Sequence, residues 1–413
     1  MAYDKGCELI RNWKENTVYI SLMQLTLLVV NFFLITIISR TYGAEIYGEY
    51  ASAKSLSVLI GTASVLSLAL VTTKVRAQNL DFSNSVFSNS YYLVLRNLIF
   101  SLVLLFPISF VLGRNYLWTS IFLIGYIFNE MIHIALAYYQ AKGNFVISSK
   151  QILVRILFYG LGAWIIVNNG FSILWLIIFQ TLMFFLFFLV AHFYLPKSEL
   201  IFDSKNNNET RSELTKSGKK MVSTTFSAVL ISELDIVLLG LFYSGPLLGV
   251  LALSRRLLEA LFQLIGASLD MIFPELSKAK DINEISEMRI RLRKVFLFSF
   301  SIPILFYLFK DVAEGIFINV LGNEFNDVAK ITSSILFCLP VMIWSRINII
   351  FSRALNFELN ITKAISFGAI LSYGIFFIMH KIGYNPAILS IIISQVLIAG
   401  LTTYSFRKSR ASN

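Results

Sequence analysis

Three cations lie inside long apolar stretches of the sequence: Lys54, Arg255 and Arg256. A charged side chain at the centre of a bilayer costs about 2.5–3.5 kcal/mol even on insertion scales, so it must face protein or a water-filled cavity. These three residues are therefore the predicted substrate-binding cations, for a substrate that is anionic. The alternative is internal pairing, because Glu259 follows Arg256 by three positions and Arg255 by four on one predicted helix.

Two further pairs are candidates for carrying protons or cations. Glu130 and His133 lie three positions apart near the middle of an apolar stretch. A carboxylate beside an imidazole can relay protons, because both can titrate near neutral pH when buried. Glu233 and Asp235 lie in another apolar stretch, where they must be protonated, paired with the arginines or bound to a cation. We predict these four as ion-coupling residues, with structural ion pairs as the alternative.

The chain as a whole has the composition of a membrane protein. Of its 413 residues, 56% are hydrophobic and 14% are charged, and the mean hydropathy is +0.72. Soluble domains have about 45–50% and about 25% respectively. This excludes a cytosolic enzyme, a secreted disulfide scaffold and a disordered chain. The two cysteines and three histidines are scattered, so we expect no disulfide framework, no metal site and no cofactor.

Apolar runs of about 20 residues, long enough to cross a bilayer, recur along the chain. They lie near 17–39, 49–72, 87–112, 116–140, 147–167, 172–195, 218–242, 246–270, 292–310, 328–350, 361–380 and 385–405. We therefore predict an all-α integral membrane protein of about 12 transmembrane helices. The expected parts are an N-terminal six-helix lobe (1–195), a cytoplasmic linker (196–217) and a C-terminal six-helix lobe (218–413).

The formal net charge of +11 reports orientation in the membrane. About 25 basic residues fall on the side of the N-terminus and about five on the other side, which predicts that both termini are cytoplasmic. No basic face interleaved with stacking aromatics lies outside the apolar runs, so we expect no nucleic-acid partner.

The two lobes carry traces of an internal repeat. A shift of 201 positions sets Gly48 on Gly249 and Lys54 on Arg255. Because six spans per lobe is an even number, the lobes would share one orientation. They would then be related by a pseudo-two-fold axis along the membrane normal, with the substrate handled at their interface. No Walker motif is present, so we expect no direct ATP drive within this chain. No Ser-His-Asp or Cys-His set is present either, and we expect that the protein is not an enzyme.

Four short segments carry a family likeness: Ser39-Arg40-Thr41-Tyr42-Gly43, Tyr47-Gly48-Glu49-Tyr50, Gln140-Ala141-Lys142-Gly143 and Phe273-Pro274-Glu275-Leu276-Ser277. They resemble Wzx-type O-antigen flippases, which form part of the polysaccharide-transporter branch of the multidrug/oligosaccharidyl-lipid/polysaccharide exporter superfamily. The resemblance implies two six-helix lobes that work by alternating access around a cationic lumen. Lys54, Arg255 and Arg256 fit such a lumen.

The resemblance also implies the substrate, the partners and the location. The substrate would be an undecaprenyl-pyrophosphate-linked oligosaccharide, an O-antigen or related surface-polysaccharide repeat unit. The protein would move it from the cytoplasmic to the periplasmic leaflet of the bacterial inner membrane. Coupling to H⁺ or Na⁺ is our own hypothesis, based on the buried carboxylates Glu233, Asp235 and Glu130. Membrane lipids, a polysaccharide polymerase and chain-length machinery are the other expected partners.

Physical chemistry agrees with this expectation, since a sugar-diphosphate head group cannot enter hydrocarbon without losing its hydration. A basic, water-filled cleft would replace that hydration while the polyprenyl tail stays in lipid. Two alternatives remain open. A drug/cation antiporter of the related multidrug-extrusion branch would favour acidic lumen residues. An O-antigen polymerase would be expected to carry a large periplasmic loop, whereas the predicted outer loops here are short.

Overall fold

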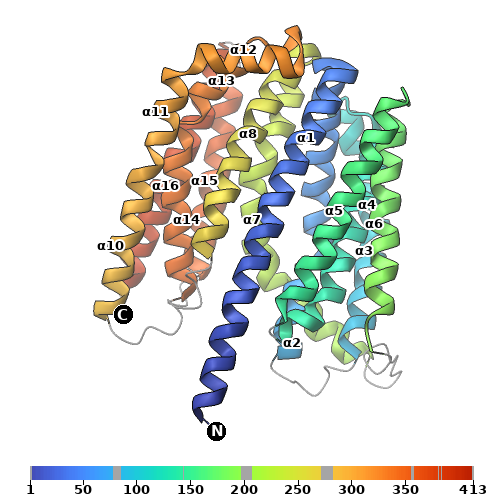
Figure 1. Cartoon of the computed structure of the whole chain (residues 1–413), viewed down its shortest axis with the longest axis vertical. Helices are drawn as coiled ribbons and strands as arrows, with labels where there is room; N and C mark the ends of the chain where they lie inside the picture. Colours follow the sequence, from blue (N-terminus) through green and yellow to red (C-terminus); the bar gives the residue numbers. More distant parts are fainter. Residues whose placement is uncertain are drawn as a thin grey trace. The chain divides into compact units, whose positions relative to one another are not determined.

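In a computed structural model of the chain, the described residues are 2–77, 85–142, 144–196, 207–270, 282–354, 358–379, 381–382 and 384–411. Across these ranges the regular secondary structure is helical throughout, which confirms the all-α prediction (Figure 1). The Phe273–Ser277 segment of the family likeness lies outside the described residues.

Every predicted span falls on helical residues, although three spans are divided between consecutive helices. The helices are α1 (Ala2–Val65), α2 (Leu68–Ala77), α3 (Val86–Val111), α4 (Tyr116–Ala141), α5 (Phe145–Asn168), α6 (Ile173–Phe193), α7 (Asn207–Phe242), α8 (Gly245–Asp270), α10 (Ile282–Ser299), α11 (Ser301–Leu308), α12 (Lys310–Leu321), η3 (Asn323–Phe325), α13 (Val328–Ile335), α14 (Cys338–Ala354), α15 (Glu358–Met379) and α16 (Tyr384–Ala411). The first two predicted spans lie within α1 and α2.

The helices form two compact units. Unit 1 comprises Met1–Thr41 and Glu49–Val229, and unit 2 comprises Tyr42–Gly48 and Leu230–Asn413. The sequence placed the end of the first lobe at residue 195 and the start of the second at 218, whereas the units divide inside α7. Two lobes are present as predicted, but each one includes a piece of chain that sequence position assigns to the other.

Helix α4 is the centre of unit 1. It packs against α2, α3, α5 and α6, and 61% of its most apolar 18-residue window is buried. Buried side chains such as Phe122, Ile127 and Ala135 lie on several sides of the helix, so little of it is left to face lipid. A helix surrounded by protein is where a bilayer tolerates polar and ionisable side chains.

Two breaks divide the first two helices: one lies at Gly43, between the predicted spans 17–39 and 49–72, and the other lies inside the second of these spans. At Gly43 the backbone has φ 82° and ψ 171°, a conformation open essentially to glycine alone. Glu324 Oε2 accepts a hydrogen bond from the N–H of Ala44 at 2.7 Å, which satisfies a donor that has no partner within its own helix. The second break is at Leu66 and Ser67, both at φ 53°, which is unusual for non-glycine residues.

The first part of α7 supports the break at Leu66. A Cβ added to Gly218 would lie 2.9 Å from the carbonyl oxygen of Leu66, and Ser67 Oγ donates to Thr225 Oγ1 at 2.9 Å. Helix α7 also begins earlier than the predicted 218, at Asn207. Arg211 of these added turns donates from Nε to Asn89 Oδ1 of α3 at 2.8 Å. These contacts explain why the first 23 residues of α7 belong to unit 1.

Unit 2 is built around α8, α14 and α16, with α13 against α8 and α15 against α16. Two spans predicted as single helices, 292–310 and 328–350, are broken in the structure. Helices α10 and α11 are followed by α12 at a bend of 72°, and η3 with α13 is followed by α14 at a bend of 48°. Pro340 accounts for the second break, since it offers no N–H to the carbonyl of Leu336.

Gly48 and Gly249 pack directly against each other in unit 2. A Cβ on Gly249 would lie 1.9 Å from the carbonyl oxygen of Ala44, and a Cβ on Gly48 would lie 2.7 Å from the backbone nitrogen of Gly249. Only glycine allows so close a backbone approach. These two residues are the pair matched by the 201-residue shift, and the structure brings them together within unit 2.

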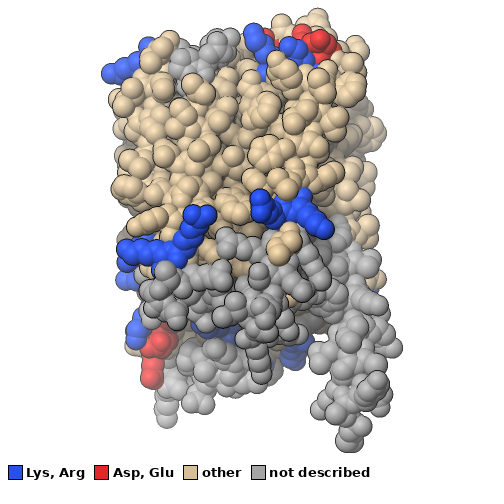
Figure 2. Space-filling view, turned by 90° about the vertical axis from the view of Figure 1, so that its left-hand side faces the viewer, with Lys and Arg blue, Asp and Glu red and all other residues tan. Residues whose placement is uncertain are grey.

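The described helices identify a multi-pass membrane protein. Six of them are long and apolar enough to cross a membrane, or eight if each bent pair is one span. The lipid-compatible surface is broad: Phe110 and Phe193, for example, are each 81% exposed. Figure 2 shows the face of unit 2 as a wide band of uncharged residues bounded on both sides by Lys and Arg side chains.

Candidate functional site

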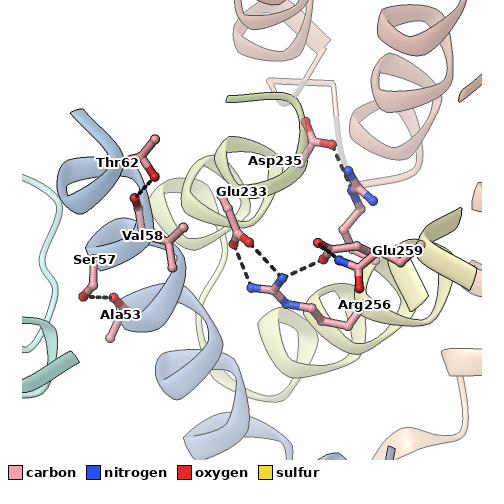
Figure 3. A network of polar contacts seen from close by, with 10 residues as sticks. Ala53, Ser57, Val58, Thr62, Glu233, Asp235, Arg256 and Glu259 are labelled. Atoms are coloured by element: carbon pink, nitrogen blue, oxygen red, sulfur yellow. Dashed lines mark hydrogen bonds and ion pairs between the residues drawn. The ribbon is translucent and has the colours of Figure 1, made fainter. Parts of the chain in front are cut away.

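Two arginines of α8 bind carboxylates of α7 within unit 2 (Figure 3). Arg256 binds Glu233 with both terminal nitrogens, at 3.1 Å and 2.8 Å, and its Nη1 also donates to Glu259 Oε2 at 2.6 Å. Arg255 Nε donates to Asp235 Oδ2 at 3.1 Å. We call these five residues the arginine cluster. A bidentate arginine–carboxylate pair is among the strong, geometrically specific ion pairs of proteins.

Helix geometry explains why the two arginines take different partners. Consecutive residues point about 100° apart around a helix, so Arg255 and Arg256 diverge. Glu259 lies one turn after Arg256 on the same face, which makes it the intrahelical partner that the sequence anticipated. Gln263 Nε2 donates to the other oxygen of Glu259 at 3.0 Å, so both of the Glu259 carboxylate oxygens are bound.

Access and charge differ across the arginine cluster. The Arg255 side chain is 1% exposed, whereas that of Arg256 is 18% exposed, so Arg256 is the arginine that a ligand can reach in this structure. With every group ionised, two arginines face three carboxylates, which leaves one negative charge in excess. A proton or a cation would neutralise that excess.

Lys54 lies on α1 in unit 1 and is half-buried. Among the residues that the structure describes, it forms no hydrogen bond, ion pair or ring contact. The hydroxyls of Ser57 and Thr62, further along the helix, donate to the carbonyl oxygens of Ala53 and Val58 at 2.7 Å each (Figure 3). Those hydroxyls are therefore not directed at Lys54. An ammonium group without a countercharge on a membrane helix requires water or an anionic ligand.

A second polar cluster lies between α4, α5 and α6 of unit 1. Arg155 of α5 is 7% exposed, donates from Nη1 to Asn129 Oδ1 at 2.6 Å and lies 5.1 Å from the centroid of the Phe184 ring. Glu130 interacts electrostatically with Arg155 and forms a side-chain hydrogen bond with Tyr126. His133 lies close enough to Arg155 for an electrostatic interaction. We call Asn129, Glu130, His133 and Arg155 the α4–α5 cluster.

The predicted site residues thus fall into three places. The structure brings Arg255, Arg256, Glu233 and Asp235 together in unit 2 and places Glu130 and His133 around Arg155 in unit 1. Lys54, also in unit 1, has no partner among the described residues. Their roles in binding and coupling stay predictions.

Sequence reasoning missed Arg155, which organises the α4–α5 cluster, and Glu324, which binds the N–H of Ala44 beside the break in α1. Arg155 is in the first half of its predicted span, where an arginine extending to the membrane surface is an equally good interpretation, yet the structure buries it. Its distance from the end of the helix was the available signal. Glu324 had no signal, because its partner Ala44 is 280 positions away.

Part of the chain matches a known protein family. A family model described as polysaccharide biosynthesis protein matches residues 108–330, more than half of the chain. No curated protein matches the chain at the level of sequence.

Solved MATE transporters have a similar fold. For the bent form of VcmN from Vibrio cholerae the TM-score is 0.64 at 13% identity, covering 97% of this chain and 98% of that one. For the inward-facing conformation of a multidrug resistance MATE family transporter of the MOP superfamily, the TM-score is 0.63 at 11% identity, covering 95% of this chain and 98% of that one. For the eukaryotic MATE transporter AtDTX14 the TM-score is 0.60 at 15% identity, covering 98% of this chain and 99% of that one. At such low identities the likeness establishes the fold.

Proposed function

This chain belongs to the polysaccharide biosynthesis protein family, and from that premise we propose that it flips an undecaprenyl-pyrophosphate-linked oligosaccharide across a bacterial inner membrane. Family and fold agree with the sequence resemblance to the polysaccharide-transporter branch of exporters. The cargo would be an O-antigen or related repeat unit, moved to the periplasmic leaflet by ion-coupled alternating access. A polymerase and chain-length machinery would take over the product there.

The observation that carries the substrate class is Lys54, a half-buried cation on a membrane helix with no described partner. A diphosphate would supply the missing countercharge and bind through charge-assisted hydrogen bonds. Arg256 is the second proposed contact, since part of its side chain is exposed. Arg255 would reach the substrate only after Asp235 moves away from it.

The charge balance of the arginine cluster supports coupling to a cation. One carboxylate exceeds the number of arginines, so a proton or Na⁺ would be bound when the cluster is closed and released when a substrate anion competes for Arg256. Glu233 and Asp235 are the proposed coupling groups here. In unit 1, Glu130 and His133 are the proposed proton carriers, since Arg155 lies beside both.

Reconstitution into liposomes with a fluorescent lipid-linked oligosaccharide tests the substrate proposal. We expect Lys54→Ala to slow flipping at least tenfold and Lys54→Arg to retain most of the rate, because arginine keeps the charge. Lys330→Ala, an exposed cation of unit 2, is the matched control and should flip at the wild-type rate. Flipping by Lys54→Ala that equals the control would contradict the assignment.

The same liposomes test ion coupling when a pH or Na⁺ gradient is imposed. Glu233→Gln equalises arginines and carboxylates while leaving Arg256 paired with Glu259. We expect this variant to flip without a response to the gradient, whereas the wild-type rate should change severalfold. A wild-type protein that ignores both gradients would refute coupling and leave the substrate assignment standing.

The other candidate is a multidrug/cation antiporter, because a multidrug resistance MATE family transporter has a similar fold. Ethidium efflux from the same liposomes distinguishes the antiporter from the flippase, because a cation should be repelled by Lys54.

Deletion of the gene separates a flippase from a polymerase. Loss of a flippase leaves complete lipid-linked units on the cytoplasmic leaflet, whereas loss of a polymerase leaves single units exported.

A further inference from the structure

We propose that α12 lies flat in the head-group region of the outer leaflet and binds that lipid surface through one apolar edge. Helix α12 follows α11 at a bend of 72°, and in Figure 1 it runs across the upper end of unit 2, away from the C-terminus. Its position follows the ninth predicted span, on the side predicted to be periplasmic. The inference depends on membrane insertion and on no particular transported substrate.

The exposure of successive residues divides α12 into three faces. Phe317 and Leu321, one turn apart, are 9% and 3% exposed, and the Phe317 ring packs against Phe306 of α11 with the ring centroids 6.4 Å apart. Val312 and Ile316, also one turn apart, are 62% and 55% exposed. A third face is polar and open to solvent, with Asp311, Gly315 and Asn319 at spacings of four. One face of α12 therefore packs on protein, while an apolar face and a polar face lie side by side on its outer surface. This arrangement is typical of a helix at the interface between lipid and water.

The exposed apolar edge continues the lipid-facing surface of α11. Leu305 and Leu308 of α11 are 53% and 69% exposed, and Phe309 at the bend is 60% exposed. Val312 and Ile316 follow Phe309 at three and seven positions, so they extend this surface onto α12. Because the α11 surface meets acyl chains in a membrane-spanning unit, the same lipid covers its continuation.

Residues beside the bend have the chemistry of the membrane boundary. Tyr307 is 53% exposed, and Lys310 Nζ lies 5.3 Å from the centroid of its ring. Tyrosine and lysine are the side chains that anchor helices at the head-group level, with an apolar stem in lipid and a polar end in water. The pair therefore marks the depth at which the chain turns from crossing the membrane to running along it.

A re-entrant path into the hydrocarbon does not fit α12. The helix has 12 residues, about 18 Å at 1.5 Å per residue, which is too short to cross a core of about 30 Å. It carries Lys310, Asp311 and Glu314 within five positions, and Asp311 is exposed. An exposed carboxylate is costly in hydrocarbon and is readily hydrated at the interface.

Nitroxide labels at single cysteines measure this depth directly. Each variant, Val312→Cys, Ile316→Cys, Asp311→Cys or Asn319→Cys, is made in a Cys7→Ser background, where Cys338 is 0% exposed and does not compete for the label. The protein is placed in phosphatidylethanolamine/phosphatidylglycerol bilayers. Collision of each label with oxygen, which concentrates in lipid, is compared with collision with a water-soluble nickel chelate. Leu305→Cys serves as the reference for a site within the acyl region.

We expect labels at 312 and 316 to collide mainly with oxygen, at a shallower depth than the label at 305, and labels at 311 and 319 to collide mainly with the chelate. All four labels at the depth of 305 would overturn the proposal in favour of a re-entrant segment. All four in water would overturn it in favour of a helix that stands clear of the membrane. The substituted side chains are exposed, so labelling leaves the packed face of α12 intact.

Discussion

Substitution of Gly249 by alanine is the sharpest test of how α8 is packed. The added Cβ would lie 1.9 Å from the carbonyl oxygen of Ala44, and ordinary contact begins near 3.4 Å. The obstacle is backbone, so no side-chain rotation relieves it and the helices must separate by more than 1 Å. Overpacking costs about 1–3 kcal/mol, and a clash with backbone belongs at the upper end, about 3 kcal/mol; alanine regains about 1 kcal/mol of helix propensity. We expect a net loss of about 2 kcal/mol.

Gly266→Ala is the matched control on the same helix. A Cβ at Gly266 would meet nothing within 4 Å, so the substitution should keep only the gain in helix propensity, about 1 kcal/mol. For a unit of this size each kcal/mol shifts the melting temperature by about 2–4 °C. We therefore expect Gly249→Ala to melt about 4–8 °C below the wild type and Gly266→Ala about 2–4 °C above it.

Cys338 provides the assay. It is fully buried in unit 2, so in a Cys7→Ser background a thiol-reactive fluorophore reports the unfolding of unit 2 during heating in detergent. Equal melting temperatures for Gly249→Ala and Gly266→Ala would refute the close approach of the two helices. A lowered temperature in both would show that alanine harms α8 for reasons unrelated to Ala44.

Three further changes probe individual contacts. Glu324→Ala should destabilise unit 2 by about 1 kcal/mol, because the N–H of Ala44 loses its acceptor. Glu324→Gln keeps a side-chain oxygen and should cost less in the same melting assay. Equal effects of the two substitutions would exclude the hydrogen bond as the cause. Arg256→Gln should lower the stability of unit 2 by about 3–5 kcal/mol, because it leaves two buried carboxylates uncompensated. Adding Glu233→Gln should restore part of that stability. Strictly additive losses in the double variant would rule out an interaction between the two side chains. Arg211→Ala should increase amide hydrogen exchange in the first turns of α7, since the contact with Asn89 is lost, and unchanged exchange there would show that other contacts hold these turns.

The fold was largely predictable because hydrophobic runs report it locally. Spans such as 116–140 coincide almost to the residue with helices such as α4. The breaks were harder to predict: the bend of 72° before α12 has no glycine or proline within five residues of Phe309 to mark it. The boundary inside α7 depends on contacts of Arg211 with residues more than a hundred positions earlier. Such long-range partners leave no local pattern.

The candidate site was predictable in its residue types and only partly in its pairings. Intrahelical reach correctly indicated that Glu259 would neutralise an arginine. That Glu233 would pair with Arg256 and Asp235 with Arg255 depends on how α7 and α8 are rotated, which a sequence does not state. Lys54 and Arg255, matched in the repeat, have different surroundings, because Asp235 has no counterpart beside Lys54 among the described residues.

The interlaced composition of the two units has a consequence for the order of events during synthesis. Unit 1 lacks a supporting helix until residue 229 has left the ribosome, and Tyr42–Gly48 belongs to a unit whose remainder is made much later. The N–H of Ala44 has no acceptor until Glu324, 280 residues later, has been synthesised. Until then it must be hydrated or bound by the insertion machinery. Because unpaired backbone groups and exposed helix faces invite misassembly, a chain stalled between 249 and 324 should be a preferred substrate of membrane quality control. Separately expressed halves cut within 196–206 should assemble only when both are present.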